Sequence, residues 1–176
     1  MIQNINELNK FHKNLDPWGY KDNPDDQKRV DILLSEIPKK DYYNVLDIGC
    51  GQGFVTKFLP GEKIIGVDIS KNAINNANKL NDKKNLAFEV CSIFELQKKF
   101  DKKFDLIIIT GVLYPQYIGE SSSLIYKIIN DLLNDNGLLV SVHINEWYNC
   151  QFPFLKLKEI HYSYRNYNHK LEIYAK

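Results

Sequence analysis

Residues 45–54 read Val-Leu-Asp-Ile-Gly-Cys-Gly-Gln-Gly-Phe, an apolar run that passes directly into three glycines at alternating positions. The run predicts a buried strand, and Gly49, Gly51 and Gly53 predict a turn in which a ligand approaches the backbone more closely than side chains would permit. A dinucleotide-binding loop has its third glycine one place later, and a phosphate-binding P-loop carries a Gly-Lys-Ser/Thr that is absent here. The loop therefore departs from both phosphate-binding patterns.

Two acids narrow the choice of ligand. Asp47 lies two residues before the first glycine, where it disfavours a pyrophosphate and suits a ligand with positive charge. Asp68 closes the next expected strand, 21 residues after Asp47, where an acid typically receives the two ribose hydroxyls of an adenosine. Asp68 also suits a capping role at the following helix. We therefore expect a site for an adenosine that carries a cation.

Short apolar runs alternate with helical patterns through the centre of the chain. Near-continuous runs such as Leu106–Ile109 indicate strands buried on both faces, as in a parallel sheet covered by helices. The pattern predicts an α/β fold, a doubly wound, Rossmann-like, mostly parallel sheet with its ligand crevice at the carboxyl ends of the strands. The expected strands are 45–48, 63–67, 86–90, 104–110 and 138–143, and the expected helices are 54–59, 71–80 and 122–133.

The two ends of the chain differ from this centre. An N-terminal arm or lid, residues 1–22, precedes a first helix at 23–38, which opens with Asn-Pro and closes with Pro. Near the other end, residues 157–162 and 170–174 alternate apolar and polar around a turn-rich centre, which predicts an antiparallel hairpin on one edge of the sheet. We expect residues 1–176 to form a single domain.

Composition argues against several classes of function. Of 176 residues, 23 are basic and 22 acidic, and the lysine pairs are scattered among acids, so no footprint for a nucleic-acid backbone is expected. Three widely spaced cysteines indicate neither a disulfide framework nor a zinc site, and no ligand spacing predicts a metal. No apolar run is long enough to span a bilayer, and none resembles a signal peptide. We expect a cytoplasmic protein without nucleic-acid or membrane partners.

Three segments together resemble one family. Val45–Phe54, Gly66-Val-Asp-Ile-Ser70 and Phe104-Asp-Leu-Ile-Ile-Ile-Thr-Gly-Val-Leu113 are closely similar to motifs of the class I S-adenosylmethionine-dependent methyltransferases. The resemblance implies S-adenosyl-L-methionine as cofactor and S-adenosyl-L-homocysteine as product. The ammonium and sulfonium of this cofactor would explain Asp47, and the expected terminal hairpin matches the topology of the family.

By position, the resemblance also implies which residues contact the cofactor. The loop residues take the methionine end, with Cys50 read as a small packing residue, while Asp68 clamps the ribose. The family commonly has an acid near the adenine where Ser92 stands here, and Thr110 lies near the transferring methyl group together with Gly111. The expected contacts are Trp18, Asp47, Gly49, Cys50, Gly51, Gly53, Asp68, Ile69, Ser92, Ile93 and Thr110.

Three residues are candidates for catalysis on the acceptor side. His143 ends the fifth expected strand, where site residues collect, although a histidine there equally suits a structural hydrogen bond. Tyr114 follows the fourth strand, where its ring suits either the site or the packing of a loop. His12 lies in the arm, which either folds across the cofactor or packs on the sheet. A hydroxyl acceptor needs a base, whereas a neutral amine needs none.

The segment Asp16-Pro-Trp-Gly-Tyr20 resembles the opening of a subgroup related to nodulation-type N-methyltransferases and sugar-modifying methyltransferases. That resemblance implies a small acceptor, a carbohydrate-derived or phosphorylated metabolite of surface polysaccharide or secondary metabolism. Two alternatives stay open: a non-catalytic cofactor-binding partner subunit, and a nucleic-acid methyltransferase, although the Asn/Asp-Pro-Pro-aromatic signature of base methylation is missing. Trp147, Phe152 and Phe154 indicate either an apolar face buried in a homodimer or by a partner subunit, or a loop packed on its own core.

Overall fold

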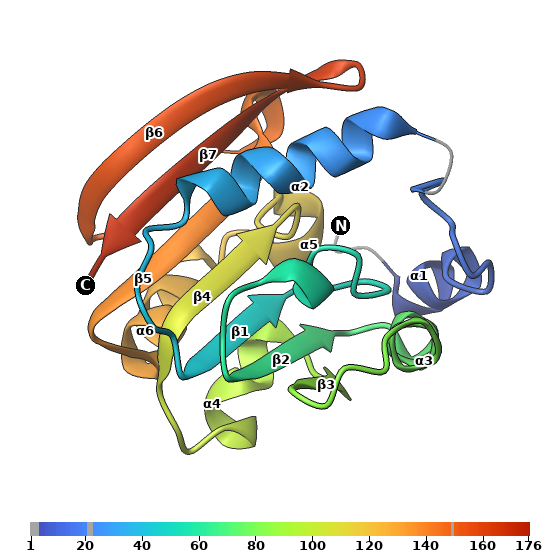
Figure 1. Ribbon diagram of the computed structural model, residues 1–176, viewed down its shortest axis with the longest axis horizontal. Coiled ribbons are helices and arrows are strands. Elements are labelled where there is room, and N and C mark those ends of the chain that lie inside the picture. Colours follow the sequence, from blue (N-terminus) through green and yellow to red (C-terminus); the bar gives the residue numbers. More distant parts are fainter. Residues whose placement is uncertain (1–3, 21–22, 149) are drawn as a thin grey trace.

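The computed structural model describes residues 4–20, 23–148 and 150–176, and its strands form one mixed sheet (Figure 1). The strands are β1 (Asn44–Ile48), β2 (Lys63–Asp68), β3 (Leu86–Val90), β4 (Phe104–Thr110), β5 (Leu133–Ile144), β6 (Leu155–Tyr164) and β7 (Tyr167–Ala175). Their order across the sheet is β3-β2-β1-β4-β5-β7-β6. The pairs among β1 to β5 are parallel, whereas β7 is antiparallel to both β5 and β6. The predicted mostly parallel sheet with a C-terminal hairpin on one edge is confirmed.

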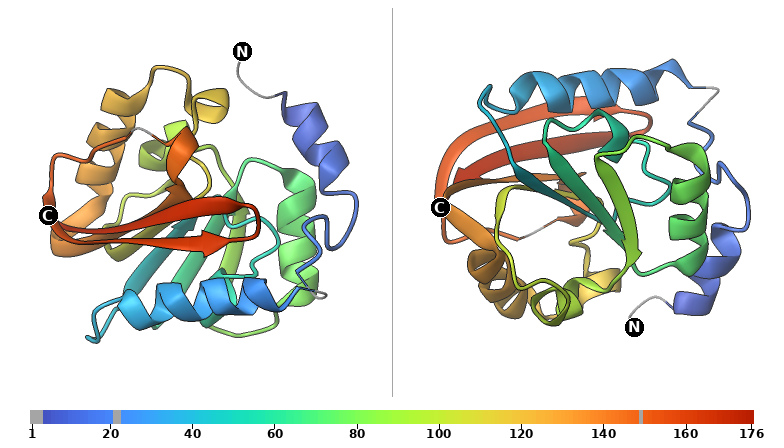
Figure 2. Two further views of the ribbon diagram at one scale, coloured as in Figure 1. Left: turned by 90° about the horizontal axis from the view of Figure 1, so that it is seen from above. Right: turned by 60° about the horizontal axis from the view of Figure 1, so that its bottom comes forward.

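Helices cover both faces of the sheet (Figure 2). They are α1 (Ile5–Phe11), α2 (Pro24–Glu36), α3 (Lys71–Leu80), α4 (Leu96–Lys99), α5 (Pro115–Ile118) and α6 (Ser122–Leu132). Leu33 of α2 shares a buried cluster with Leu106 and Ile108, whereas Ile125 of α6 shares another with Ile107. Neighbouring residues of β4 thus point to opposite faces, which explains its uninterrupted apolar run. Within the described ranges, no helix is long and apolar enough to cross a membrane.

The first predicted helix forms with the expected cap. The side chain of Asn23 accepts a hydrogen bond from the Asp25 N–H at 3.0 Å, and Pro24 occupies the first turn, where a missing N–H costs no helical bond. The helix ends at Glu36, two residues before the predicted end. Its apolar side faces the sheet, and α2 lies along the C-terminal hairpin with its N-terminal end toward the carboxyl ends of the parallel strands (Figure 1).

The N-terminal arm contains a helix that the sequence pattern did not predict. Helix α1 lies beside α3 (Figures 1 and 2), where the Asn9 side chain accepts a hydrogen bond from Ser70 Oγ at 2.9 Å. Asn72 Nδ2 donates to the Asn9 carbonyl at 2.8 Å. Polar contacts between segments 61 and 63 residues apart thus hold the arm against the start of α3. Residues 1–3 and 21–22 of the predicted arm lie outside the described residues.

Two further predicted helices differ from the structure. The helix predicted at 54–59 is a single 3-10 turn, Thr56–Phe58. The Thr56 hydroxyl in this turn donates a hydrogen bond to the Asp47 carboxylate. The helix predicted at 122–133 ends one residue early, because Leu133 pairs with Phe104 and begins β5. The short helix α4 was not predicted, since four residues carry no readable period.

The loop before the hairpin packs on its own chain. Phe152 is 5% exposed, and its ring lies 4.9 Å from the Tyr126 ring and 5.6 Å from the Tyr174 ring. Phe154 stacks on Phe152 with ring centroids 6.1 Å apart. Both phenylalanines therefore pack on the core of their own chain, which was one of the two alternatives expected for this loop. Trp147 differs, because 44% of its surface is exposed.

Candidate cofactor and active site

The three loop glycines follow β1 and all adopt the left-handed backbone region, with φ values of +78° at Gly49, +54° at Gly51 and +79° at Gly53. A Cβ at Gly49 would overlap the Val112 side chain, and a Cβ at Gly53 would press on the Phe88 ring. By contrast, a Cβ at Gly51 would meet no described atom within 4 Å. The middle glycine therefore faces open space at the carboxyl end of β1, as close approach of a ligand requires.

Asp47, at the end of β1, is 1% exposed. Its Oδ2 accepts a hydrogen bond from Thr56 Oγ1 at 2.6 Å, whereas Oδ1 has no hydrogen-bond partner among the described residues. Burial raises the pKa of this carboxyl to about 6, although Thr56 opposes the shift. Because a buried acceptor without a partner is costly, Asp47 fits a cationic donor such as an ammonium group.

Asp68, the last residue of β2, accepts two backbone hydrogen bonds, whereas the side chain that caps α3 is that of Ser70. Asp68 Oδ2 accepts a hydrogen bond from the Gly51 N–H at 3.0 Å, and its Oδ1 accepts from the Ser70 N–H at 2.8 Å, at the start of α3. Burial raises the pKa of Asp68, and the two amides and His12 oppose that shift. Asp68 thus fixes the glycine loop against the end of β2, with its carboxylate beside the open space at Gly51.

The expected adenine contacts lie at the same edge of the sheet. Ile69 follows β2 and is 45% exposed, while Ser92 and Ile93 follow the adjacent strand β3. The Ser92 hydroxyl accepts a hydrogen bond from the Phe94 N–H at 3.3 Å, so it caps a 3-10 turn. The structure therefore brings the predicted ribose and adenine residues together, with an exposed apolar side chain at Ile69.

The arm crosses the glycine loop. Gln52 Nε2 donates a hydrogen bond to Asp16 Oδ1 at 3.0 Å, and Asn76 Nδ2 donates to the carbonyls of His12 at 2.9 Å and Asn14 at 3.1 Å. His12 is buried and its pKa is lowered, mainly by burial, while Asp68 opposes that shift. His12 therefore lies near Asp68, while the catalytic role expected for it stays a prediction. The pairing of Gln52 with Asp16 was not predicted, because it is visible only in three dimensions.

Trp18 lies in the same arm and is 45% exposed. Its ring meets the Phe11 ring edge to face at 4.8 Å, and its carbonyl accepts a hydrogen bond from Arg165 at 2.7 Å. The arm is thus attached both to the glycine loop and to the tip of the hairpin.

Arg29 of α2 is the main site residue that the sequence analysis missed. Its Nε is buried without a hydrogen-bond partner among the described residues, and its guanidinium lies over the Tyr164 ring at 5.0 Å from the centroid. It is close enough to Asp47 to lower the pKa of that carboxyl, against the larger effect of burial. The sequence did carry a signal for Arg29, because this basic residue lies next to Val30 and near Leu33 on the apolar side of a predicted helix, where a cation is unusual.

A cavity of about 10 Å³, room for roughly one water molecule, lies between α2 and the sheet beside Arg29. Tyr162 and Thr110 both line it, so the cavity reaches the end of β4 where the methyl group was expected. Its lining residues are Arg29, Leu33, Val55, Thr110, Val142 and Tyr162.

The two other predicted catalytic residues are engaged in structural hydrogen bonds. His143 is fully buried, its Nε2 accepts from the N–H groups of Val112 and Leu113, and its Nδ1 lies 3.0 Å from Ser141 Oγ. Both ring nitrogens are therefore engaged, which agrees with the structural hydrogen bond that was the alternative role for His143. Tyr114 is 5% exposed, and its hydroxyl accepts from the Ile144 N–H at 2.8 Å.

Burial also sets the charge of these groups. It lowers the pKa of His143 to about 3 and raises the pKa of Tyr114 to about 12, so both are neutral near pH 7. No group of three or more His, Cys, Asp or Glu side chains suited to a metal ion occurs in the described part of the chain.

The comparisons with known proteins agree with this geometry. The model of the "Methyltransferase domain" family matches residues 39–173. Malonyl-[acyl-carrier protein] O-methyltransferase of Acetivibrio thermocellus is 27% identical over 153 residues, which are 84% of this chain and 50% of that protein. The chain thus spans about half the length of this curated relative.

Solved structures share the fold. The N-methyltransferase NodS from Bradyrhizobium japonicum WM9, crystallised with S-adenosyl-L-homocysteine, superimposes with a TM-score of 0.81 at 20% identity, covering 98% of this chain and 97% of that one. A putative methyltransferase in complex with the Trm112 methyltransferase activator of Haloferax volcanii gives 0.76 at 14% identity, covering 96% and 97%.

A seven-stranded sheet of this order with a glycine loop after β1 and an acid at the end of β2 defines the class I methyltransferase fold. This chain belongs to the methyltransferase domain family, and its cofactor is S-adenosylmethionine. The residues present fit that cofactor, since Asp47 keeps an unpartnered buried oxygen and Gly51 faces open space.

Proposed function

We propose that this chain is an S-adenosylmethionine-dependent methyltransferase of a small molecule, acting in the cytoplasm as a single domain. One observation carries the proposal. Four buried polar atoms that have no hydrogen-bond partner in the described residues belong to side chains around the glycine loop. They are His12 Nδ1, Arg29 Nε, Asp47 Oδ1 and Gln52 Oε1. Unpartnered buried polar atoms are rare in folded proteins and mark places where a ligand completes the bonding.

Two of these atoms suit the amino-acid end of the cofactor. The Asp47 carboxylate attracts the ammonium group, and the Arg29 guanidinium attracts the carboxylate. Because Asp47 and Arg29 interact electrostatically and approach from different layers, β1 and α2, they suit a zwitterion bound between them. Asp68 accepts the ribose hydroxyls, and Ile69 covers one face of the adenine, as the family resemblance implied.

The cofactor supplies an activated methyl group on a sulfonium, and the protein contributes position and exclusion of water. Thr110 ends β4 and Gly111 follows it beside the expected methionine end, so they set where the acceptor meets the methyl group. Neither His143 nor Tyr114 offers a free basic atom near this point. The arrangement therefore favours an acceptor that needs no base, such as a neutral amine, over an alcohol.

For the acceptor we propose a carbohydrate-derived or phosphorylated metabolite. The Asp-Pro-Trp-Gly-Tyr segment of the arm supports this, as does the similarity to NodS, an N-methyltransferase. Exposed aromatic rings at the same edge of the sheet suit the flat apolar face of a sugar. Trp147 is 44% exposed and Tyr167 is 43% exposed, and their ring centroids lie 4.9 Å apart.

The test is methyl transfer from radiolabelled S-adenosylmethionine to a panel of acceptors. The panel contains amino sugars, their N-acetylated forms, sugar phosphates, a malonyl thioester and bulk RNA. We expect labelling of an amino sugar or amino sugar phosphate and none of its N-acetylated form, because acetylation removes the nucleophilic lone pair. Labelling of the malonyl thioester or of RNA alone would overturn the acceptor class and leave the methyltransferase activity in place.

A second candidate is a cofactor-binding subunit that acts only with a partner. The similarity to a putative methyltransferase in complex with an activator protein favours this candidate. The two candidates differ in one measurement: a chain that binds S-adenosyl-L-homocysteine but labels no acceptor until a copurified partner is added is a subunit of a larger enzyme. Transfer by the purified chain alone would exclude that reading.

A further inference from the structure

The segment that follows β4 leaves the sheet next to the glycine loop, and one side chain holds its backbone. His143 Nε2 accepts hydrogen bonds from the Leu113 N–H at 3.1 Å and from the Val112 N–H at 3.3 Å. Gly111 is the last residue of this segment to bond the neighbouring strand, with its N–H 2.9 Å from the Val142 carbonyl. Since buried amides require partners, the imidazole replaces the strand that Val112 and Leu113 have left.

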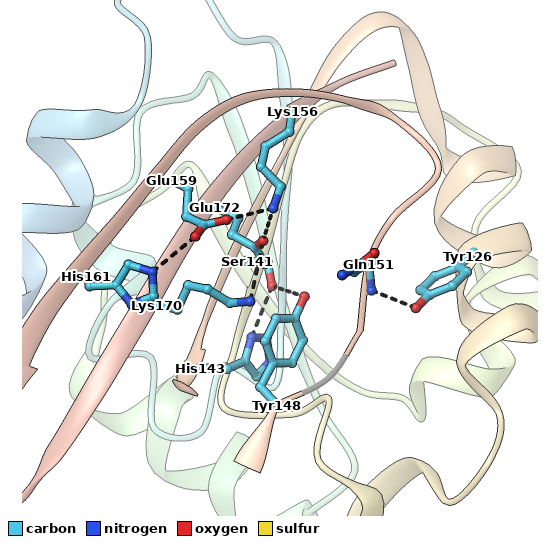
Figure 3. Close-up of polar contacts among 10 residues, drawn as sticks. All are labelled: Tyr126, Ser141, His143, Tyr148, Gln151, Lys156, Glu159, His161, Lys170 and Glu172. Carbon is cyan, nitrogen blue, oxygen red and sulfur yellow. Dashed lines mark hydrogen bonds and ion pairs between the residues drawn. The ribbon is translucent and has the colours of Figure 1, made fainter. Parts of the chain in front are cut away.

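The other ring nitrogen is also occupied. Nδ1 of His143 lies 3.0 Å from Ser141 Oγ, which lies 3.1 Å from the Tyr148 hydroxyl (Figure 3). Because Nε2 accepts from two N–H groups, the neutral ring must carry its proton on Nδ1 and donate it to Ser141. The Tyr148 ring stacks on the imidazole with centroids 4.3 Å apart and planes 9° from parallel. Both nitrogens and one face of the ring are therefore committed.

Val112 transmits this arrangement to the cofactor loop. The Val112 methyl group lies where a Cβ of Gly49 would be, so its side chain rests directly on the first loop glycine. The Gly49 N–H in turn donates to the Val67 carbonyl at 2.8 Å, next to Asp68. If the Val112 backbone shifted, its side chain would therefore push on Gly49, which cannot move away without loss of its hydrogen bond to Val67.

We propose that His143 is a positioning residue, a neutral imidazole protonated on Nδ1 that fixes the Val112–Leu113 backbone and, through Val112, the glycine loop that binds the cofactor. The inference rests on the proposed function, because it assigns the cofactor to that loop. It replaces an acceptor-side base with a geometric role. Displacement of about 1 Å is enough to slow a positioned reaction about a hundredfold, so such support matters for transfer.

The first experiment uses the wild-type protein labelled with ¹⁵N histidine. Nitrogen spectra between pH 5 and pH 8, with and without S-adenosyl-L-homocysteine, report the tautomer of each ring. We expect one ring to stay neutral throughout, with a proton on Nδ1 and a bare Nε2, and His143→Gln removes its signal. The surroundings of His143 favour the neutral ring. Burial lowers its pKa most, the neighbouring His169 and Lys170 lower it further, and the pKa falls to about 3. A His143 ring that titrates in this range, or carries its proton on Nε2, would overturn the inference.

The second experiment measures coupling to the cofactor loop. Calorimetric titration with S-adenosyl-L-homocysteine compares wild type, His143→Leu, His143→Gln, Val112→Ala and the double variant His143→Leu/Val112→Ala. We expect about tenfold weaker binding in His143→Leu, because two amides lose their acceptor, and recovery to within about threefold in His143→Gln, which restores an acceptor oxygen. The two residues are expected to act on the loop one through the other. The double variant should therefore bind S-adenosyl-L-homocysteine about as tightly as the single variant with the lower affinity.

Circular dichroism and thermal unfolding confirm that each variant is folded before titration. Additive losses, or unchanged affinity in His143→Leu, would contradict the positioning role. A wild-type protein that does not bind S-adenosyl-L-homocysteine would instead overturn the proposed function itself, so the two failures are distinguishable. The spectra of the wild type need no variant, and they decide the tautomer even if His143→Leu does not fold.

Discussion

Arg165, at the tip of the β6–β7 hairpin, donates a hydrogen bond to Asp26 Oδ2 of α2 at 2.9 Å and another to the Trp18 carbonyl at 2.7 Å. The Asp26 side chain is fully buried and also accepts from the Tyr164 hydroxyl. One guanidinium thus joins three segments that are distant in sequence: the arm, the first long helix and the C-terminal hairpin. These segments surround Arg29, so the contact also shapes the proposed cofactor site.

We expect Arg165→Met to lower the free energy of unfolding by about 1–3 kcal/mol, because it leaves a buried carboxylate with one partner; the partial exposure of Arg165 limits the loss. It should also speed dissociation of S-adenosyl-L-homocysteine in stopped-flow experiments, since the arm loses its attachment to the hairpin. Lys127→Met is the matched control, as it removes an exposed ion pair with Asp131 and should change stability by about 0.5 kcal/mol or less. Equal effects in the two variants would contradict this account of the arm.

The ion pairs on the hairpin make a second test (Figure 3). Lys156 Nζ donates to Glu172 Oε1 at 2.6 Å, and the Glu172 side chain is fully buried. Lys170 is further from the same oxygen, at 3.6 Å. Chemical denaturation of Lys156→Met should therefore show a loss of about 1–3 kcal/mol, while Lys156→Arg retains most of the stability. A loss as small as that of Lys127→Met would show that water replaces the pair.

The raised pKa of Asp47 predicts a pH dependence of cofactor binding. An ammonium group binds the ionised carboxylate, and a carboxyl with a pKa of about 6 is mostly protonated at pH 5. Affinity for S-adenosyl-L-homocysteine should therefore rise about tenfold between pH 5 and pH 7.5. In Asp47→Asn, binding should be weaker at neutral pH and the dependence much reduced. A flat profile in the wild type would contradict the assignment of Asp47 to the ammonium group.

The same shift has the opposite sign for the stability of the ligand-free protein. Because the folded-state pKa lies above the ordinary value of 3.8, the Asp47 contribution is fully present below pH 3.8 and is lost as pH rises through about 6. The loss amounts to about 3 kcal/mol at most. Asp68 shifts in the same direction, so urea unfolding of Asp47→Asn should flatten only part of this pH dependence.

The sheet and the cofactor loop were predictable because their signals are local. The apolar run at 106–109 and the three alternating glycines act on neighbouring residues, so periodicity and spacing reveal them. Helix α1 was missed because its stability comes from Asn9 contacts to α3, more than 60 residues away. The early end of α6 was missed for a similar reason, since pairing with Phe104 outweighs the local helical pattern.

The acceptor side was less predictable than the cofactor side. His143 was correctly placed at the end of β5, but its partners are backbone amides about 30 residues away, which carry no sequence signal. Arg29 was missed because its role depends on rings and acids contributed by other elements. Residues whose function follows from the loop itself were therefore easier to find than residues whose function follows from packing.

The most direct test of the account compares two glycines. Gly51 and Gly19 have φ values of +54° and +67°, and a Cβ at either would meet no described atom within 4 Å. Alanine at each position should therefore cost a similar backbone strain, about 1–2 kcal/mol. Only Gly51 adjoins the proposed cofactor, so only Gly51→Ala places a methyl group in its space.

The measurement is calorimetric titration of wild type, Gly51→Ala and Gly19→Ala with S-adenosyl-L-homocysteine. We predict micromolar-range binding in the wild type, affinity within about threefold of it in Gly19→Ala, and at least about a hundredfold loss in Gly51→Ala. No binding to the wild type, or equal affinity in both alanine variants, would contradict the claim that the glycine loop binds the cofactor.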